Sequence, residues 1–66
     1  MTITVNGEAR QVAGGTTLDG LLEQLGVRRD GTAVALNGDV VPRGQHGSTA
    51  LHEGDGLEII VAVAGG

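Results

Sequence analysis

Residues 57–63 read Leu-Glu-Ile-Ile-Val-Ala-Val, and the sequence then closes with Ala-Gly-Gly at positions 64–66. The first stretch is apolar at almost every position, which favours a strand at the centre of a sheet with a neighbour on each side. Side chains alternate along a strand. One set is therefore expected to face a covering helix: Leu57, Ile59, Val61 and Val63. The other set is expected to face solvent or a partner protein: Glu58, Ile60 and Ala62.

An Asn-Gly pair at residues 6–7 predicts a hairpin at the start of the chain. Both residue types tolerate the positive φ angles that a type I′ turn requires. The pair follows a β-branched strand at residues 2–5 and precedes a return strand at residues 8–12.

A second Asn-Gly pair, at residues 37–38, predicts another hairpin. It follows a third strand at residues 32–36 and precedes a short fourth strand that begins with Val40 and Val41. Pro42 should end this strand, because proline has no backbone donor. Residues 44–56, with their glycines and histidines, are expected to be irregular.

In residues 18–25, leucines recur at the spacing that is typical of one face of a helix. Thr16 or Thr17 can cap its start, Gly26 is placed to end it in a left-handed conformation, and Gly20 weakens its interior. Its apolar face consists of four leucines at helical spacing: Leu18, Leu21, Leu22 and Leu25.

The element order is therefore hairpin, helix, hairpin and final strand. One helix can cover one face of a mixed sheet of four or five strands. The final, most apolar strand should lie parallel to the first strand at the centre of that sheet. This arrangement is the β-grasp, or ubiquitin-like, fold of the α+β class. We expect a β-grasp domain over residues 1–63 and a flexible C-terminal tail at residues 64–66.

Composition narrows the classes of function. The 66 residues carry a net charge of −4, which argues against nucleic acid or an anionic membrane as partner and suits a basic protein. The N-terminus has neither the basic nor the apolar segment of a signal peptide, so a cytoplasmic location is expected. A body this small has little room for a deep pocket, which favours a carrier or binding module over an enzyme.

The chain has no cysteine, which excludes disulfides and thiolate metal ligands. His46 and His52 lie near Glu53 and Asp55, but their spacing is not typical of a metal site, and we expect a solvated loop without a metal. Arg43 is expected to be exposed, where it could contact a phosphate or carboxylate of a partner.

The C-terminal diglycine is the strongest chemical feature. Gly66 has no Cβ, so its carboxylate is sterically open. Gly65 and Ala64 would form a thin thread that can enter a partner's channel. Once activated, for example as an acyl-adenylate, the carboxylate can be transferred to an amine, a thiol or a sulfide. Without cysteine, any sulfur that the chain carries must be held on this carboxylate.

Several short motifs occur in order along nearly the whole chain: Val5-Asn6-Gly7-Glu8, Thr17-Leu18, Leu21-Leu22-Glu23-Gln24-Leu25, Ala35-Leu36-Asn37-Gly38, Val41-Pro42-Arg43, Glu53-Gly54-Asp55 and Ala64-Gly65-Gly66. With this ordered set, the chain as a whole resembles the thiamine-biosynthesis sulfur carrier family, ThiS. Members often have an aromatic residue shortly after the Pro-Arg pair, where this chain has Gln-His-Gly at residues 45–47.

The resemblance implies a cycle at Gly66. A partner adenylyltransferase would use ATP and magnesium to form an acyl-adenylate there. A sulfur donor, such as a cysteine desulfurase, would convert it to a thiocarboxylate, and thiazole synthase would take the sulfur. The chain would be a co-substrate with no permanently bound cofactor, and its partner surface is expected to include Glu58, Ile60, Ala62 and Arg43.

Other functions fit the same fold and tail. Related carriers supply sulfur to molybdopterin or to cysteine synthesis. A ubiquitin-like modifier would join Gly66 to a lysine of a target protein. In a regulatory or toxin-antitoxin-like binding domain, the tail would have no chemical role.

Overall fold

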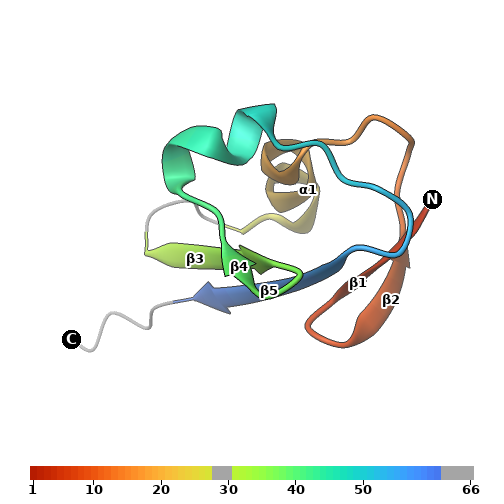
Figure 1. Cartoon of the computed structure of the whole chain (residues 1–66), viewed down its shortest axis with the longest axis horizontal. Coiled ribbons are helices and arrows are strands. Elements are labelled where there is room, and N and C mark those ends of the chain that lie inside the picture. Colours follow the sequence, from red (N-terminus) through yellow and green to blue (C-terminus); the bar gives the residue numbers. More distant parts are fainter. Residues whose placement is uncertain (28–30, 62–66) are drawn as a thin grey trace.

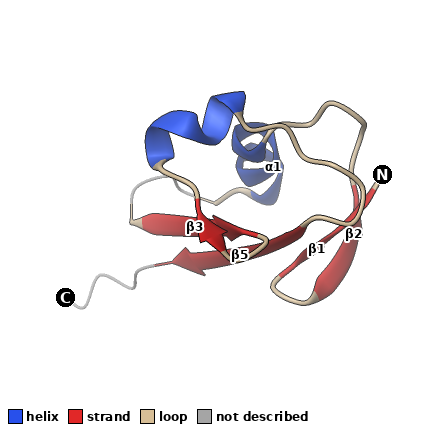
Figure 2. Cartoon of the chain, in the orientation of Figure 1, coloured by secondary structure: helices blue, strands red, loops and turns tan. Residues whose placement is uncertain are grey.

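Five strands form a single sheet, and both helical segments lie on one side of it (Figures 1 and 2). The computed structural model describes residues 1–27 and 31–61. The strand order across the sheet is β2-β1-β5-β3-β4. The elements are β1 (Thr2–Val5), β2 (Glu8–Gln11), α1 (Leu18–Leu25), β3 (Thr32–Leu36), β4 (Asp39–Val40), the 3₁₀ helix η1 (Arg43–Ser48) and β5 (Gly56–Val61).

The first hairpin turns as its Asn-Gly pair predicts. Asn6 and Gly7 have φ angles of 51° and 84°, and β1 pairs with β2 in antiparallel register. The return strand ends at Gln11 and not at Val12 as expected. Val12 nevertheless remains bonded to the N-terminal residue, since its N–H donates to the Met1 carbonyl over 2.9 Å.

The second hairpin has the same backbone geometry, with φ angles of 51° at Asn37 and 88° at Gly38. Strand β4 covers Asp39–Val40, one residue earlier than the expected start at Val40. Val41 still donates its N–H to the Val34 carbonyl over 2.9 Å. The chain therefore leaves the sheet just before Pro42, as proline chemistry requires.

Helix α1 begins and ends at the predicted residues. Thr17 is its N-cap, and its hydroxyl accepts a hydrogen bond from the Gly20 N–H over 3.1 Å. Gly26 ends the helix with a φ of 71°. Three of the four leucines are buried, and Leu25 is half-buried against the core. The periodicity of the leucines thus identified the face that packs on the sheet.

Strand β5 occupies the predicted central place. It runs parallel to β1, with Thr4 opposite Gly56 and Val5 opposite Leu57. It runs antiparallel to β3 from Leu57 to Val61. The nearly unbroken apolar run of this strand is therefore explained by its neighbours on both sides.

The predicted faces of β5 hold for most of its length. Leu57 is buried and Ile59 packs against the core, whereas Ile60 is 60% exposed. Val61 lies opposite the buried Thr32 and so shares the predicted face, but it is 57% exposed. Strand β1 turns away after Val5, so Val61 has a strand beside it on the β3 side alone. Val63 lies outside the described residues.

The core lies between the sheet and α1, and its buried apolar side chains in the described part of the chain are all aliphatic. The segment before β5 contributes the buried Leu51 to this core. The Leu51 N–H donates to the Thr16 carbonyl over 2.9 Å, which holds the segment beside the start of α1. The buried apolar residues are Ile3, Val5, Val12, Leu18, Leu21, Leu22, Val34, Leu51 and Leu57. Residues 44–56 are not wholly irregular as expected, because they include most of η1, which contacts α1.

Within residues 1–27 and 31–61, no helix is long and apolar enough to cross a membrane.

Candidate functional site

The candidate site begins at Val61, the last described residue of β5. The strand has β1 on one side and β3 on the other, so it lies in the middle of the sheet and not at its edge (Figure 1). The predicted reactive residue, Gly66, and the thread residues Gly65 and Ala64 lie outside the described residues, as does Ala62. What the structure places is the strand that leads to them.

The start of β5 is held by backbone hydrogen bonds to both neighbouring strands. Thr4 donates its N–H to the Asp55 carbonyl over 2.9 Å, and Asn6 donates to the Leu57 carbonyl over 2.8 Å. From the other side, Asn37 donates to the Gly56 carbonyl over 2.7 Å. A strand held in this way is a rigid base for the residues that follow it.

The sheet face opposite α1 carries an exposed apolar surface, which we call the open-face patch. Ile60 lies directly opposite Ala33, and Glu58 lies opposite Ala35. Ala35 in turn lies opposite Val40, which is 73% exposed. Residues directly opposite one another in antiparallel strands share a face. The open-face patch therefore consists of Ala33, Ala35, Val40, Glu58 and Ile60.

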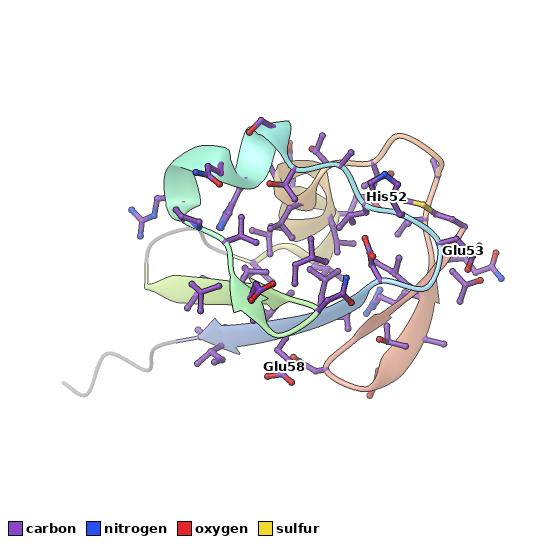
Figure 3. All side chains as sticks on the ribbon, viewed as in Figure 1. His52, Glu53 and Glu58 are labelled. Atoms are coloured by element: carbon purple, nitrogen blue, oxygen red, sulfur yellow. The ribbon has the colours of Figure 1, made fainter. Side chains whose placement is uncertain are left out.

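Figure 3 shows Glu58 on the side of the sheet that faces away from both helical segments. Its carboxylate gives a negative charge to an otherwise apolar patch. The sequence identified Glu58 and Ile60 as partner-surface residues, and the structure brings them together on one face. It adds Ala33, Ala35 and Val40, which the register of β3 with β4 and β5 places on the same face.

Arg43 does not join this patch. It is exposed, but it begins η1, which lies on the same side of the sheet as α1 (Figure 1). Glu58 and Ile60 lie on the opposite side. The structure thus separates Arg43 from the other partner-surface residues that it describes.

The two histidines have different environments, and the expectation of a solvated loop was wrong for His46. His46 is buried, with 3% of the residue exposed, and it lies in η1, which contacts α1. The Nε2 atom lies 3.0 Å from the Val41 carbonyl oxygen. A carbonyl only accepts, so Nε2 carries the proton in this contact. His46 therefore links η1 to the end of β4.

His52 fits the expectation of a solvated side chain, since that side chain is 79% exposed. Its Nδ1 atom lies 3.9 Å from Asp55 Oδ2. Figure 3 shows His52 and Glu53 on the loop that precedes β5, and both carboxylate oxygens of Glu53 accept from the Thr2 N–H at 3.1 Å. Among the residues that the structure describes, no group of three or more His, Cys, Asp or Glu side chains could hold a metal ion.

The model of the ThiS family matches residues 3–66, which include the final strand and the diglycine. The chain belongs to the ThiS family. A curated member, the sulfur carrier protein ThiS of Escherichia coli, is 41% identical over 66 residues, with full coverage of both chains.

Two further relatives are much longer proteins. Thiazole synthases of Magnetococcus marinus and Paramagnetospirillum magneticum are 42% and 36% identical to the whole chain. In each case the chain spans only 20% of the relative's length. A segment similar to this ThiS-family chain is thus part of each of these larger proteins.

Solved structures show the same fold. The crystal structure of thiamine biosynthesis protein ThiS from Geobacter metallireducens has a TM-score of 0.85 and 33% identity, with full coverage of both chains. An NMR structure of a thiamine biosynthesis protein from the same organism has a TM-score of 0.82, and the chain covers 88% of it. The mixed five-stranded sheet with one α-helix is therefore the β-grasp fold.

Proposed function

We propose that this chain is a sulfur carrier for thiazole formation in thiamine biosynthesis, and that it carries the sulfur on the C-terminal carboxylate of Gly66. The main support is the 41% identity to a sulfur carrier protein over the full length of both chains. The match of the ThiS family to residues 3–66 includes the diglycine. In this role the chain is a co-substrate of other enzymes and not an enzyme itself.

The proposed loading takes two steps at Gly66. A carboxylate oxygen attacks the α-phosphorus of ATP, which gives the acyl-adenylate and releases pyrophosphate. A sulfur nucleophile then attacks the acyl carbon, the bond from this carbon to the AMP oxygen breaks, and AMP leaves. Hydrosulfide gives the thiocarboxylate after loss of its proton. A persulfide donor first gives an acyl disulfide, which a thiol must cleave.

Three partners follow from this cycle. An adenylyltransferase supplies the first step with ATP and magnesium, and a sulfur donor such as a cysteine desulfurase supplies the second. Thiazole synthase accepts the sulfur. The two relatives named thiazole synthase, which include a segment similar to the whole chain, support this acceptor over molybdopterin or cysteine synthesis. Because loading consumes ATP, we place the cycle in the cytoplasm.

The open-face patch is proposed as the docking surface for the adenylyltransferase. Ile60 and Val40 expose large apolar side chains, which proteins seldom leave together on a surface without a partner. The patch includes β5, so a partner bound there lies beside the strand that leads to Gly66. The negative charge of the chain favours a partner with a basic rim.

Intact mass spectrometry tests the proposal. The protein is incubated with the adenylyltransferase, ATP, magnesium and sulfide, and we expect the replacement of one oxygen by sulfur. The matched control is the same chain made with a C-terminal carboxamide, which keeps the length and removes only the carboxylate. This control and a chain without Gly66 should remain unchanged.

Four results would contradict the proposal. An unchanged mass of the unaltered chain would exclude the loading step. Sulfur on the carboxamide control would place the reaction elsewhere in the chain. Adducts with lysines of other proteins would instead indicate a modifier. If the thiocarboxylate form loses its sulfur to molybdopterin synthase and not to thiazole synthase, the related carrier function is correct.

A further inference from the structure

The side chain of Asn6 forms two hydrogen bonds to the backbone of a single residue in β5. Its Oδ1 accepts from the Ile59 N–H over 2.8 Å, and its Nδ2 donates to the Ile59 carbonyl over 3.3 Å. The two residues are 53 positions apart. A turn residue of the first hairpin is therefore bonded to the strand that leads to the C-terminus.

These two bonds take the place of the backbone hydrogen bonds that β1 does not make to β5 at Ile59. Strand β1 pairs with β5 only as far as Val5 and Leu57, and the Asn6 N–H adds a bond to the Leu57 carbonyl. The chain then turns away, because Asn6 has a φ of 51°. Without the Asn6 side chain, the backbone N–H and carbonyl of Ile59 would have no hydrogen-bond partner on the side of β1. The primary amide of Asn6 has the donor and acceptor of a peptide group and takes its place.

Asn37 acts on the other side of β5. Its Oδ1 accepts from the Gly56 N–H over 2.8 Å, and its Nδ2 donates to Asp55 Oδ1 over 3.1 Å. The other oxygen of Asp55, Oδ2, accepts from the His52 N–H over 2.8 Å. Both Asn-Gly turns thus hold β5, one at its start and one at its middle.

The apolar pattern of β5 alone does not set its position along β1. A shift of two residues keeps every side chain on its face and replaces Leu57 by Ile59, another large aliphatic residue. Such a shift would move the end of the strand by about 6–7 Å. On the side of β1, the contacts of Asn6 at Ile59 are specific to one register and lie beyond the last paired residues, Val5 and Leu57.

We infer that Asn6 is a positioning residue that fixes the register of β5 through its side-chain amide and so sets how far the C-terminal residues reach into the adenylyltransferase. This inference rests on the proposed function. A preference for asparagine in a type I′ turn would explain the φ angle, but glycine satisfies that angle equally well. The Asn6→Gly variant therefore keeps the turn and removes only the amide.

The test compares Asn6→Gly with Gln24→Gly, which also places a glycine at an exposed position without a change of charge, but within α1. Amide hydrogen exchange followed by NMR measures the bond at Ile59, and steady-state loading with sulfide measures kcat and KM. In Asn6→Gly we expect the Ile59 amide to exchange about 5–10-fold faster, because one hydrogen bond is lost. We also expect kcat to fall about 10-fold or more, because the reacting carboxylate is misplaced.

The KM for the chain should change less than about twofold in Asn6→Gly, because the open-face patch that sets docking is intact. Gln24→Gly should leave Ile59 exchange and both kinetic constants unchanged. The second variant, Asn6→Asp, keeps an acceptor for the Ile59 N–H. It should retain the protection of Ile59 and most of kcat.

Several outcomes would overturn the inference. The first is unchanged exchange of the Ile59 amide in Asn6→Gly, and the second is an unchanged kcat in the same variant. The third is an equal loss of kcat in Gln24→Gly, which would show that reduced stability in general lowers kcat. If the unaltered chain is not loaded with sulfur at all, the proposed function is wrong. The part of the inference that concerns the reach of the C-terminal residues into the adenylyltransferase is then wrong as well. Exchange at Ile59 would then still confirm or reject the role of Asn6 in holding β5.

Discussion

At the scale of single residues, the two histidines differ in what they contribute. His46 is a buried residue of η1, and its Nε2 donates a hydrogen bond to the Val41 carbonyl. Its Nδ1 is buried and has no hydrogen-bond partner. His52, by contrast, exposes most of its side chain to solvent. The packing of His46, and not any ligand chemistry, explains its place in the fold.

We therefore expect His46→Ala to lower the free energy of unfolding by about 2–3 kcal/mol, because it leaves a cavity and removes the bond to Val41. The matched variant His52→Ala should change it by less than about 0.5 kcal/mol. Because the chain has no aromatic residues, urea unfolding is followed by far-UV circular dichroism. Equal losses in the two variants would contradict the packing role of His46.

At the scale of elements, α1 shows how one glycine can be a weakness and another a requirement. Gly20 lies inside the helix, where a Cβ would meet the Thr17 hydroxyl at 3.4 Å and the Thr16 Cγ2 at 3.9 Å. These are ordinary van der Waals distances. Gly26 ends the helix at a φ of 71°, which side chains rarely adopt.

The two glycines should respond to alanine with opposite signs. Gly20→Ala should raise the free energy of unfolding by about 0.5–1 kcal/mol, because alanine loses less backbone entropy in a helix. Gly26→Ala should lower it by about 1 kcal/mol, because a Cβ strains the left-handed cap. Urea titrations of both variants measure the difference. A loss of stability in Gly20→Ala would mean that its new methyl group disturbs the Thr17 cap.

At the scale of the whole molecule, the sheet has two different faces. The helical segments and the aliphatic core cover one, and the open-face patch lies on the other (Figures 1 and 3). The segment before β5 lies beside α1, so it does not cover Ile60. The molecule thus presents an apolar surface that includes the strand leading to its C-terminus.

Ile60→Asp should weaken binding to the adenylyltransferase about 10-fold or more, because it places a charge in an apolar contact. Its free energy of unfolding should change little, since Ile60 is already 60% exposed. The control Gln24→Glu adds the same charge on α1 and should bind normally. Calorimetric titration gives the affinities. Unfolding of Ile60→Asp would mean that the two faces of β5 are assigned backwards.

Part of the open-face patch could be predicted from the sequence, and part of it could not. Glu58 and Ile60 were recognisable because alternation along a strand needs only the strand itself. The open-face patch also includes Ala33 and Val40, which required the register of β3 with its two neighbours. Arg43 does not lie with them, and this became clear only from the path of the chain after Pro42, which places η1 on the other side of the sheet (Figure 1).

The sequence by itself determined the strands, α1 and their order, but not η1, because the strands and α1 depend on local chemistry. The Asn-Gly pairs specify the turns, the leucine spacing and its caps specify α1, and the apolar run at residues 57–63 specifies a central strand. The diglycine likewise is read directly from the chain.

Only the tertiary structure decided what depends on residues far apart in the chain. It buried His46, exposed Val61 where β1 turns away, and joined the Asn6 amide to Ile59. Contacts over 53 positions leave no local pattern, because their geometry exists only after the sheet has formed. The apolar run therefore predicts a central strand, while the side-chain bonds of Asn6 to that strand are hidden in a sequence that presents Asn6 only as a turn residue.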